Sequence, residues 1–197
     1  MRQISAVQFV DLLAVVLKAQ PPEPWSGAAD WTFYITSRLR DLAARADAHL
    51  CASTLGVLVG KERQEHQRRE YVFDFTIFTE WNDYSLPAVV IEHENQWTEA
   101  AFMFDMWKLM IGHAPLRVMF GYANTPAAAD HLIARLREHA HQSSWTAPSG
   151  VEDLVLVGHG GMDPIKDWRV VRRHGVEWRL VSVGPAGSGE TLRGSSS

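Results

Sequence analysis

The segment PAVVIEHE, residues 87–94, is the feature that most restricts the fold of this chain. Its run VVI at 89–91 places apolar side chains on both faces of a strand, which is typical of a strand in the middle of a covered sheet. The same segment then ends in Glu92 and Glu94. Because strand side chains alternate, these two acids point to the same face, at the end of an otherwise apolar element.

Segments with helical periodicity alternate with segments rich in β-branched and aromatic residues. Apolar residues at three- and four-residue steps predict helices at residues 5–19, 28–50, 98–112 and 125–141. Short apolar runs between turn signals predict strands at residues 54–60, 71–78, 87–94, 116–123, 151–160 and 176–183. This order predicts an α/β fold, with a mixed central β-sheet flanked by helices.

The chain of 197 residues is long enough for one domain with a sizeable core, which we predict at residues 1–183. Residues 184–197 contain few apolar side chains and are predicted to be a disordered tail. Cys51 is the only cysteine. A disulfide within the chain and a cysteine-based zinc site are therefore excluded, and a single thiol fits a cytoplasmic protein. Since no apolar run reaches about 18 residues, we expect no membrane span.

The charge balance bears on the class of partner. The net charge is −4 and the pI is about 6.1, which argues against a protein that coats nucleic acid non-specifically. An enzyme with a local basic groove stays compatible with these values. Two groups of basic residues could contact backbone phosphates: Lys61, Arg63, Arg68 and Arg69, and nearer the C-terminus Lys166, Arg169, Arg172, Arg173 and Arg179.

A third acid, Asp74, lies in the apolar segment YVFDFTIF, eighteen residues before Glu92. The turn-like stretch EWNDYSLP at 80–87 separates the two, so a β-hairpin would bring Asp74 beside Glu92. Carboxylates that converge at the ends of apolar strands are costly unless a cation lies among them. These residues therefore indicate a site for a hard divalent cation, which prefers oxygen ligands.

This arrangement resembles the PD-(D/E)XK, or restriction-endonuclease-like, nuclease superfamily over about residues 28–141. In that family a helix precedes a three-strand meander. The second strand carries an Asp, the third carries an acid, a spacer and usually a Lys, and a helix then crosses to a fourth strand. Asp74 matches the first acid and Glu92 the second. Glu94 stands where Lys is most common, but in some members that Lys lies on the following helix, where Lys108 is suitably placed.

The resemblance implies a metal-dependent phosphodiester hydrolase, similar to a DNA endonuclease, with Asp74, Glu92, Glu94 and Lys108 as catalytic residues. Asp74, Glu92 and the main-chain carbonyl of His93 would hold Mg²⁺ or Mn²⁺. Glu94 would orient the attacking water or hold a second ion, and Lys108 would stabilise charge on the phosphate. The family further implies DNA as the partner, a restriction or defence role, and a homodimer. It also often has an acid on its first helix, for which the candidates are Asp30, Asp41 and Asp47.

Other interpretations of the same residues stay open. Glu at position 94 and the acidic pI also suit a catalytically silent protein of this fold that binds nucleic acid or a protein partner. A glycoside hydrolase would use Glu92 with Glu94 or with another carboxylate. A strand separates Glu92 and Glu94 by roughly 7 Å, within the range that such enzymes need. A lone helical Lys such as Lys108 is commonly a solvated surface residue. The aromatic residues that flank the site and could stack on bases or pack in the core are Trp81, Tyr84 and Trp97.

Overall fold

The computed structural model describes residues 3–17, 28–52, 73–80, 85–96, 98–143, 145, 147–159 and 167–181. The helices in these ranges are α1 (Ala6–Leu17), α2 (Ala28–Arg45), α3 (Glu99–Met110) and α4 (Pro126–Gln142). The strands are β1 (His49–Ala52), β2 (Phe75–Phe78), β3 (Val89–His93), β4 (Leu116–Ala123), β5 (Glu152–His159), β6 (Asp167–His174) and β7 (Glu177–Val181). None of the described helices is long and apolar enough to cross a membrane.

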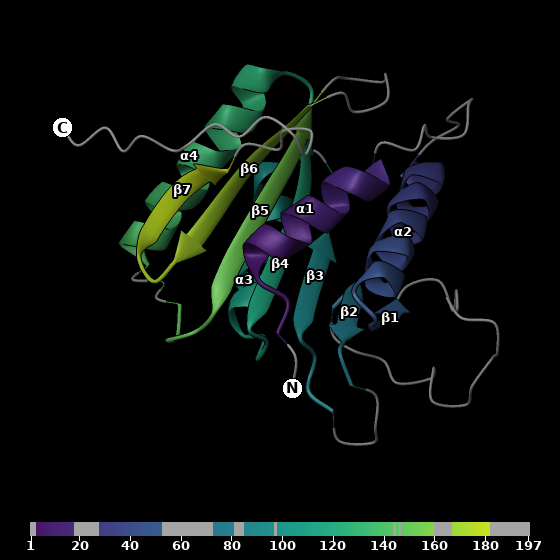
Figure 1. Ribbon diagram of the computed structural model, residues 1–197. Coiled ribbons are helices and arrows are strands. Elements are labelled where there is room, and N and C mark those ends of the chain that lie inside the picture. Colours follow the sequence, from purple (N-terminus) through teal and green to yellow (C-terminus); the bar gives the residue numbers. More distant parts are fainter. Residues whose placement is uncertain are drawn as a thin grey trace.

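The described strands form one mixed sheet in the order β1-β2-β3-β4-β5-β6-β7 (Figure 1). β1, β2 and β3 are an antiparallel meander. β3, β4 and β5 are parallel neighbours, and α3 and α4 make the two crossovers between them. β6 and β7 extend the sheet in antiparallel fashion. The predicted α/β fold with a mixed central sheet is therefore confirmed.

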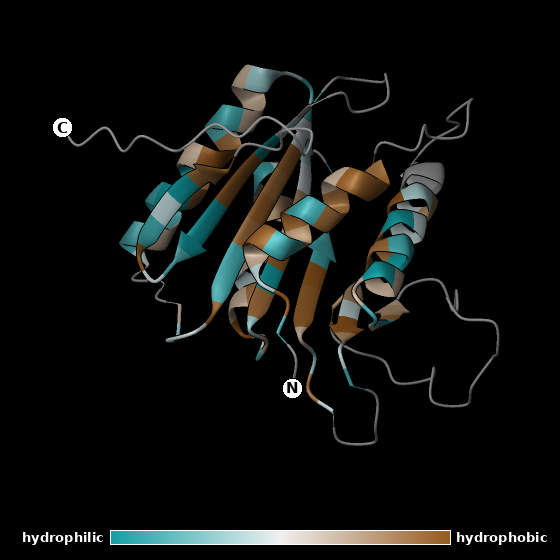
Figure 2. Ribbon diagram, in the orientation of Figure 1, coloured by the Kyte–Doolittle hydropathy of each residue, from teal (hydrophilic) through white to brown (hydrophobic). Residues whose placement is uncertain are grey.

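Helices cover both faces of the sheet, α1 and α2 in front and α3 and α4 behind in the view of Figure 1. Strand alternation divides the apolar side chains between the two layers. In β5, for example, Leu154 and Leu156 pack toward α1 and α2, while Val155 and Val157 pack toward α3 and α4. All five residues of β3 are buried, as the VVI run predicted for a central strand, and the middle of the sheet is mainly hydrophobic (Figure 2).

Side-chain caps set the starts of the two crossover helices. Thr98 accepts a hydrogen bond from the N–H of Ala101, and Thr125 accepts one from the N–H of Ala128, so each threonine is the N-cap of its helix. The end of α3 differs from the prediction. The helix was predicted to reach residue 112, but Ile111 is its C-cap, and Gly112 follows and donates its N–H to the carbonyl of Leu109.

The prediction that a helix continues to residue 50 is wrong. α2 ends at Arg45, and Asp47 adopts a positive φ of 53°. In that left-handed conformation a helix ends, here with the N–H of Ala48 bonded to the carbonyl of Ala43. The chain is then free to enter β1, which places the half-buried Cys51 on a strand. The strand predicted at 54–60 and the tail at 184–197 lie outside the described residues.

The sequence prediction missed β6, although it found its neighbours β5 and β7. β6 and β7 are joined by a two-residue loop in which Gly175 has a φ of 61°, a conformation that suits glycine in a tight hairpin. β6 contains Arg169, Arg172 and Arg173, which we predicted as phosphate contacts because they are basic. These basic residues interrupt the apolar pattern by which a strand is recognised in a sequence. The apolar residues of the strand, Val170 and Val171, are buried.

Gly121 brings α3 close to β4. A Cβ atom at this position would lie 2.4 Å from a ring carbon of Phe102, which is itself buried on α3. No ordinary side chain fits that distance, so the glycine permits a close approach of helix and strand. α3 therefore lies close against β4 at this point.

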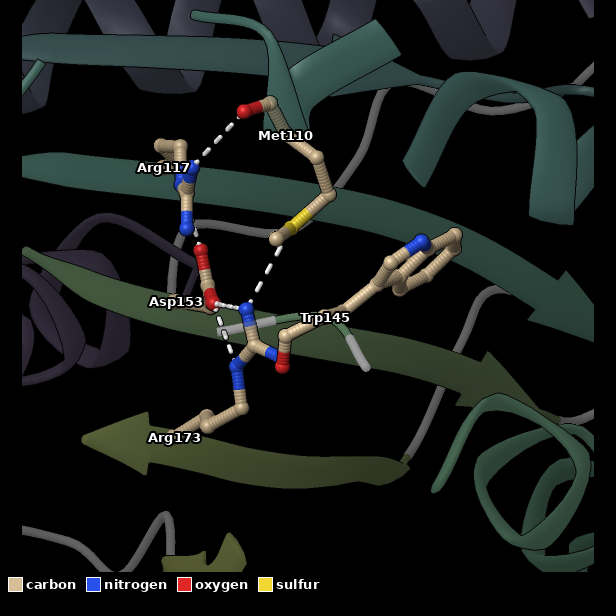
Figure 3. A network of polar contacts seen from close by, with 5 residues as sticks. All are labelled: Met110, Arg117, Trp145, Asp153 and Arg173. Carbon is tan, nitrogen blue, oxygen red and sulfur yellow. Dashed lines mark hydrogen bonds and ion pairs between the residues drawn. The ribbon is translucent and has the colours of Figure 1, made fainter. Parts of the chain in front are cut away.

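A buried ion-paired network joins β4, β5 and β6 on the face covered by α3 and α4 (Figure 3). Asp153 lies between two arginines: its Oδ1 is 2.6 Å from Nε of Arg117, and its Oδ2 is 2.6 Å from Nε of Arg173. Arg117 also donates to the carbonyl of Met110, and Arg173 donates to that of Trp145. All three charged side chains are almost wholly buried. The prediction that Arg173 contacts phosphate is therefore wrong.

We expect Asp153→Ala to destabilise the fold by about 3–5 kcal/mol, because it would leave two buried guanidinium groups without their counter-charge. Denaturant unfolding of the purified variant measures this change. The control is Asp130→Ala, which breaks the solvent-exposed ion pair with Arg169 and should cost less than about 1 kcal/mol. Equal effects of the two substitutions would contradict a special role for the buried network.

Candidate functional site

Acidic residues from the ends of β2 and β3 meet residues of α3 on one face of the sheet. Asp74 comes directly before β2, Glu92 is the fourth residue of β3, and Glu94 comes directly after that strand. The β2–β3 register pairs Phe75 with Ile91, so one step further it places Asp74 opposite Glu92. Val90, two residues before Glu92, packs in the core under α3, so Glu92 points to the same layer.

α3 contributes a cation and a further acid to this cluster. The Nζ atom of Lys108 is 2.9 Å from Oε2 of Glu92 and 3.6 Å from Oδ1 of Asp105. Lys108 thus points inward, and the interpretation as a fully solvated surface residue is wrong. We name Asp74, Glu92, Glu94, Asp105 and Lys108 together the carboxylate cluster.

The carboxylate of Asp74 also fixes the end of β3. Its Oδ2 atom accepts a hydrogen bond of 2.9 Å from the main-chain N–H of His93. Glu94, one residue further on, has a carboxylate oxygen 2.5 Å from the N–H of Gln96. The two acids that flank the strands are therefore held by backbone groups, which orients them before any ligand is present.

Burial and the repulsion between negative charges strongly perturb two acids of the cluster, Glu92 and Asp105. Burial, together with the negative charge of Asp74, raises the pKa of Glu92 to about 9, although Lys108 acts in the opposite direction. Burial also raises the pKa of Asp105 to about 6, with Glu94 and Asp74 adding to the shift while Lys108 opposes it. Negative charge thus exceeds positive charge in a poorly hydrated space.

Lys108 stays charged in this environment. Burial alone would lower its pKa, but the contacts with Glu92 and Asp105 raise it above the ordinary lysine value. Among the described residues it is the cation that ion-pairs with the cluster.

The side chain of His93 lies on the opposite face, as its position between the two glutamates predicted. Its Nε2 atom is 2.6 Å from the hydroxyl of Tyr122, and its ring contacts those of Phe75 and Phe120. Burial lowers the pKa of His93 to about 3, so the ring is neutral. A metal-binding role for its main-chain carbonyl stays a prediction.

The chemistry of these donors fits a hard cation. In the described part of the chain, no three His, Cys, Asp or Glu side chains form a ready-made metal-binding group. However, Glu92 Oε1 is buried and has no hydrogen-bond partner among the described residues. An orphaned oxygen beside Asp74 offers the ligand type that Mg²⁺ and Mn²⁺ prefer, and binding a cation would require Glu92 to lose its proton.

Sequence reasoning missed Asp105. A signal was present, because Asp105 and Lys108 are three residues apart on a predicted helix and so project from neighbouring positions. The candidate acids on α2 do not join the cluster: Asp41 pairs with Arg38 at 3.4 Å, and Asp47 is exposed at the helix end. The side chain of Asp30 lies outside the described residues.

The predicted phosphate-contacting residues that lie in the described ranges are arginines, and each of them pairs with an acid of the protein. Arg169 pairs with Asp130, Arg172 with Glu152, and Arg179 with Glu177. The predicted contacts that lie outside the described residues are Lys61, Arg63, Arg68, Arg69, Lys166, Trp81, Tyr84 and Trp97.

A comparison with protein-family models finds no match, and searches of curated proteins and of solved structures likewise find none. What this cluster does is therefore argued from the chain itself.

We expect the stability of the metal-free protein to fall as pH rises from about 4.5 to about 9, in part because Glu92 holds its proton in the folded state and loses it in the unfolded state. The fall should reach at most about 1.4 kcal/mol per pH unit from this residue. Glu92→Gln removes the titrating group, so its unfolding free energy should depend less on pH. Urea unfolding in EDTA at several pH values measures the difference.

The matched control for this prediction is Glu177→Gln on β7, since Glu177 is exposed. Its stability should follow pH as the wild type does. A Glu92→Gln variant with the wild-type pH dependence would show that Glu92 is ionised in the folded protein.

Proposed function

We propose that this protein is a metal-dependent phosphodiester hydrolase that acts as a DNA endonuclease. The observation that carries the proposal is the convergence of Asp74, Glu92 and Glu94 on one sheet face, with Lys108 reaching the same point from α3. A surplus of poorly solvated carboxylates around one lysine is costly for the apo protein. Such a cost is typical of a site that binds a cation and works on an anionic substrate.

The arrangement of elements supports the PD-(D/E)XK relationship. The chain runs α2, β1, β2, β3, α3, β4, with β1 to β3 as an antiparallel meander and β4 parallel to β3. This is the order that the resemblance implies. Asp74 beside β2, Glu92 on β3 and Lys108 on the following helix occupy the corresponding places. Glu94 departs from the most common pattern, and Lys108 supplies the positive charge in its place.

Each residue of the cluster would have a separate role in hydrolysis. Asp74 and Glu92 would hold Mg²⁺ or Mn²⁺, with the main-chain carbonyl of His93 as a further ligand. When bound, the metal would neutralise the anionic phosphodiester and activate water. Glu94 would orient the attacking water, and Asp105 would help to hold Glu94 in place. Lys108 would stabilise negative charge that develops on the phosphate.

A second candidate is a catalytically silent protein of the same fold that binds nucleic acid or a protein partner. The contact of 2.9 Å between Lys108 and Glu92 favours it, because that contact gives the buried carboxyl group a polar partner without any metal. The two candidates differ in one measurable respect, which is cleavage that depends on a divalent cation.

We expect the purified protein to cleave DNA only when Mg²⁺ or Mn²⁺ is added. Asp74→Asn keeps the shape of the side chain but removes its charge, and it should lower the cleavage rate at least about 100-fold. Lys108→Met should lower it by a similar factor, because charge on the phosphate would lose its cation. Gel-based cleavage of labelled DNA measures both rates, and circular dichroism checks folding.

The control variant is Asp130→Asn, which removes an exposed charge on α4 and should cleave at the wild-type rate. Cleavage that persists in EDTA or in Asp74→Asn would rule out the proposed chemistry. Binding without any metal-dependent cleavage would favour the silent protein.

A further inference from the structure

α3 carries an apolar stripe that nothing in the described protein covers. Phe104, Trp107 and Ile111 recur at the three- and four-residue steps of one helix face, and they are 59%, 48% and 55% exposed. The rings of Phe104 and Trp107 form a tilted pair, with centroids 5.7 Å apart. Single exposed apolar residues are common, but a contiguous aromatic stripe indicates a binding surface.

The stripe is adjacent to the carboxylate cluster. Phe104 and Lys108 are four residues apart, so they are neighbours on the surface of α3, and Trp107 adjoins them through its ring contact with Phe104. Lys108 reaches Glu92 at 2.9 Å. If one phosphate of a nucleic acid lay at Lys108, the neighbouring nucleotides could therefore lie on the rings of Phe104 and Trp107.

The size of the stripe argues against a protein partner or a second copy of this chain. The exposed parts of three such side chains amount to roughly 350 Å². A stable protein interface buries about 800 Å² on each partner, more than twice as much. Two neighbouring rings of this area do match the faces of one or two nucleobases, which stack on aromatic side chains whatever their sequence.

We infer that the substrate of the proposed nuclease is nucleic acid with unpaired bases, which stack on Phe104 and Trp107 while the adjoining phosphate lies at the carboxylate cluster. This inference rests on the proposed function and names its substrate class. A regular duplex does not suit the stripe, because its bases are stacked on one another and their faces are hidden. Single strands, frayed ends and flaps expose those faces.

The test compares a labelled single strand of about 12 nucleotides with a blunt duplex and with an abasic single strand of equal length. Binding is measured by fluorescence anisotropy with Ca²⁺, and cleavage with Mg²⁺. The wild-type protein should prefer the ordinary single strand. Phe104→Ala with Trp107→Ala should weaken binding of that strand about ten- to a hundredfold and leave the abasic strand unaffected.

The matched control is Phe33→Ala. Phe33 is 58% exposed, but it lies on α2, across the sheet from α3. It should bind and cleave the single strand as the wild type does. Both altered α3 residues are exposed, so the double variant should fold. Binding of the abasic strand to the wild-type protein tests stacking without any substitution.

Each other result has a distinct meaning. Equal binding of ordinary and abasic strands, or wild-type behaviour of the double variant, would overturn the stacking surface, while Mg²⁺-dependent cleavage would still support the nuclease. Stripe-dependent binding without any cleavage would overturn the nuclease and retain the surface. A wild-type dimer that the double variant converts to monomers, with oligonucleotide binding unchanged, would assign the stripe to a second copy and overturn the inference.

Discussion

Asp153 accepts hydrogen bonds from Arg117 on one neighbouring strand and Arg173 on the other, on a sheet face from which water is excluded. Such a network holds only in one register, because a one-residue shift of any of the three strands would send the charged side chain of that strand to the other layer. Arg117 also donates to the carbonyl of Met110, the last residue of α3. The network therefore aligns three strands and anchors the last turn of α3, which carries Lys108.

The carboxylate cluster has the opposite charge balance. In the network, two guanidinium groups flank one acid, whereas at the cluster one lysine contacts Glu92 and Asp105, and Asp74 and Glu94 add negative charge beside those acids. Both lie on the face covered by α3 and α4. The network satisfies the charge of its acid within the protein, but the cluster does not, and the raised pKa values of Glu92 and Asp105 show this difference. Uncompensated charge at a strand end has a clearer use in binding than in stability.

The sequence was enough to predict the class of fold and the positions of the strands and helices that build the site. The spacing of Glu92 and Glu94 correctly placed both on one face and His93 on the other. Predictions from local sequence patterns were wrong or incomplete where contacts between distant parts of the chain determine the structure. The end of α2 coincides with a left-handed Asp47, and on the basic strand β6 Asp153 neutralises the buried Arg173. Asp105 joins the cluster through a tertiary arrangement, because α3 packs on the sheet with Lys108 between Asp105 and Glu92.

The alternation along β3 has a consequence for which sequence changes the chain can tolerate. Ile91 and His93 face one layer, and Val90 and Glu92 face the other. Deleting one residue within the strand, such as Val90, would exchange the two sets beyond that point, turning a glutamate toward the aromatic core and an imidazole toward the acids. Conservative replacements there keep the pattern, whereas frame-preserving indels destroy it. Natural length variation should therefore be confined to the connections outside the strand.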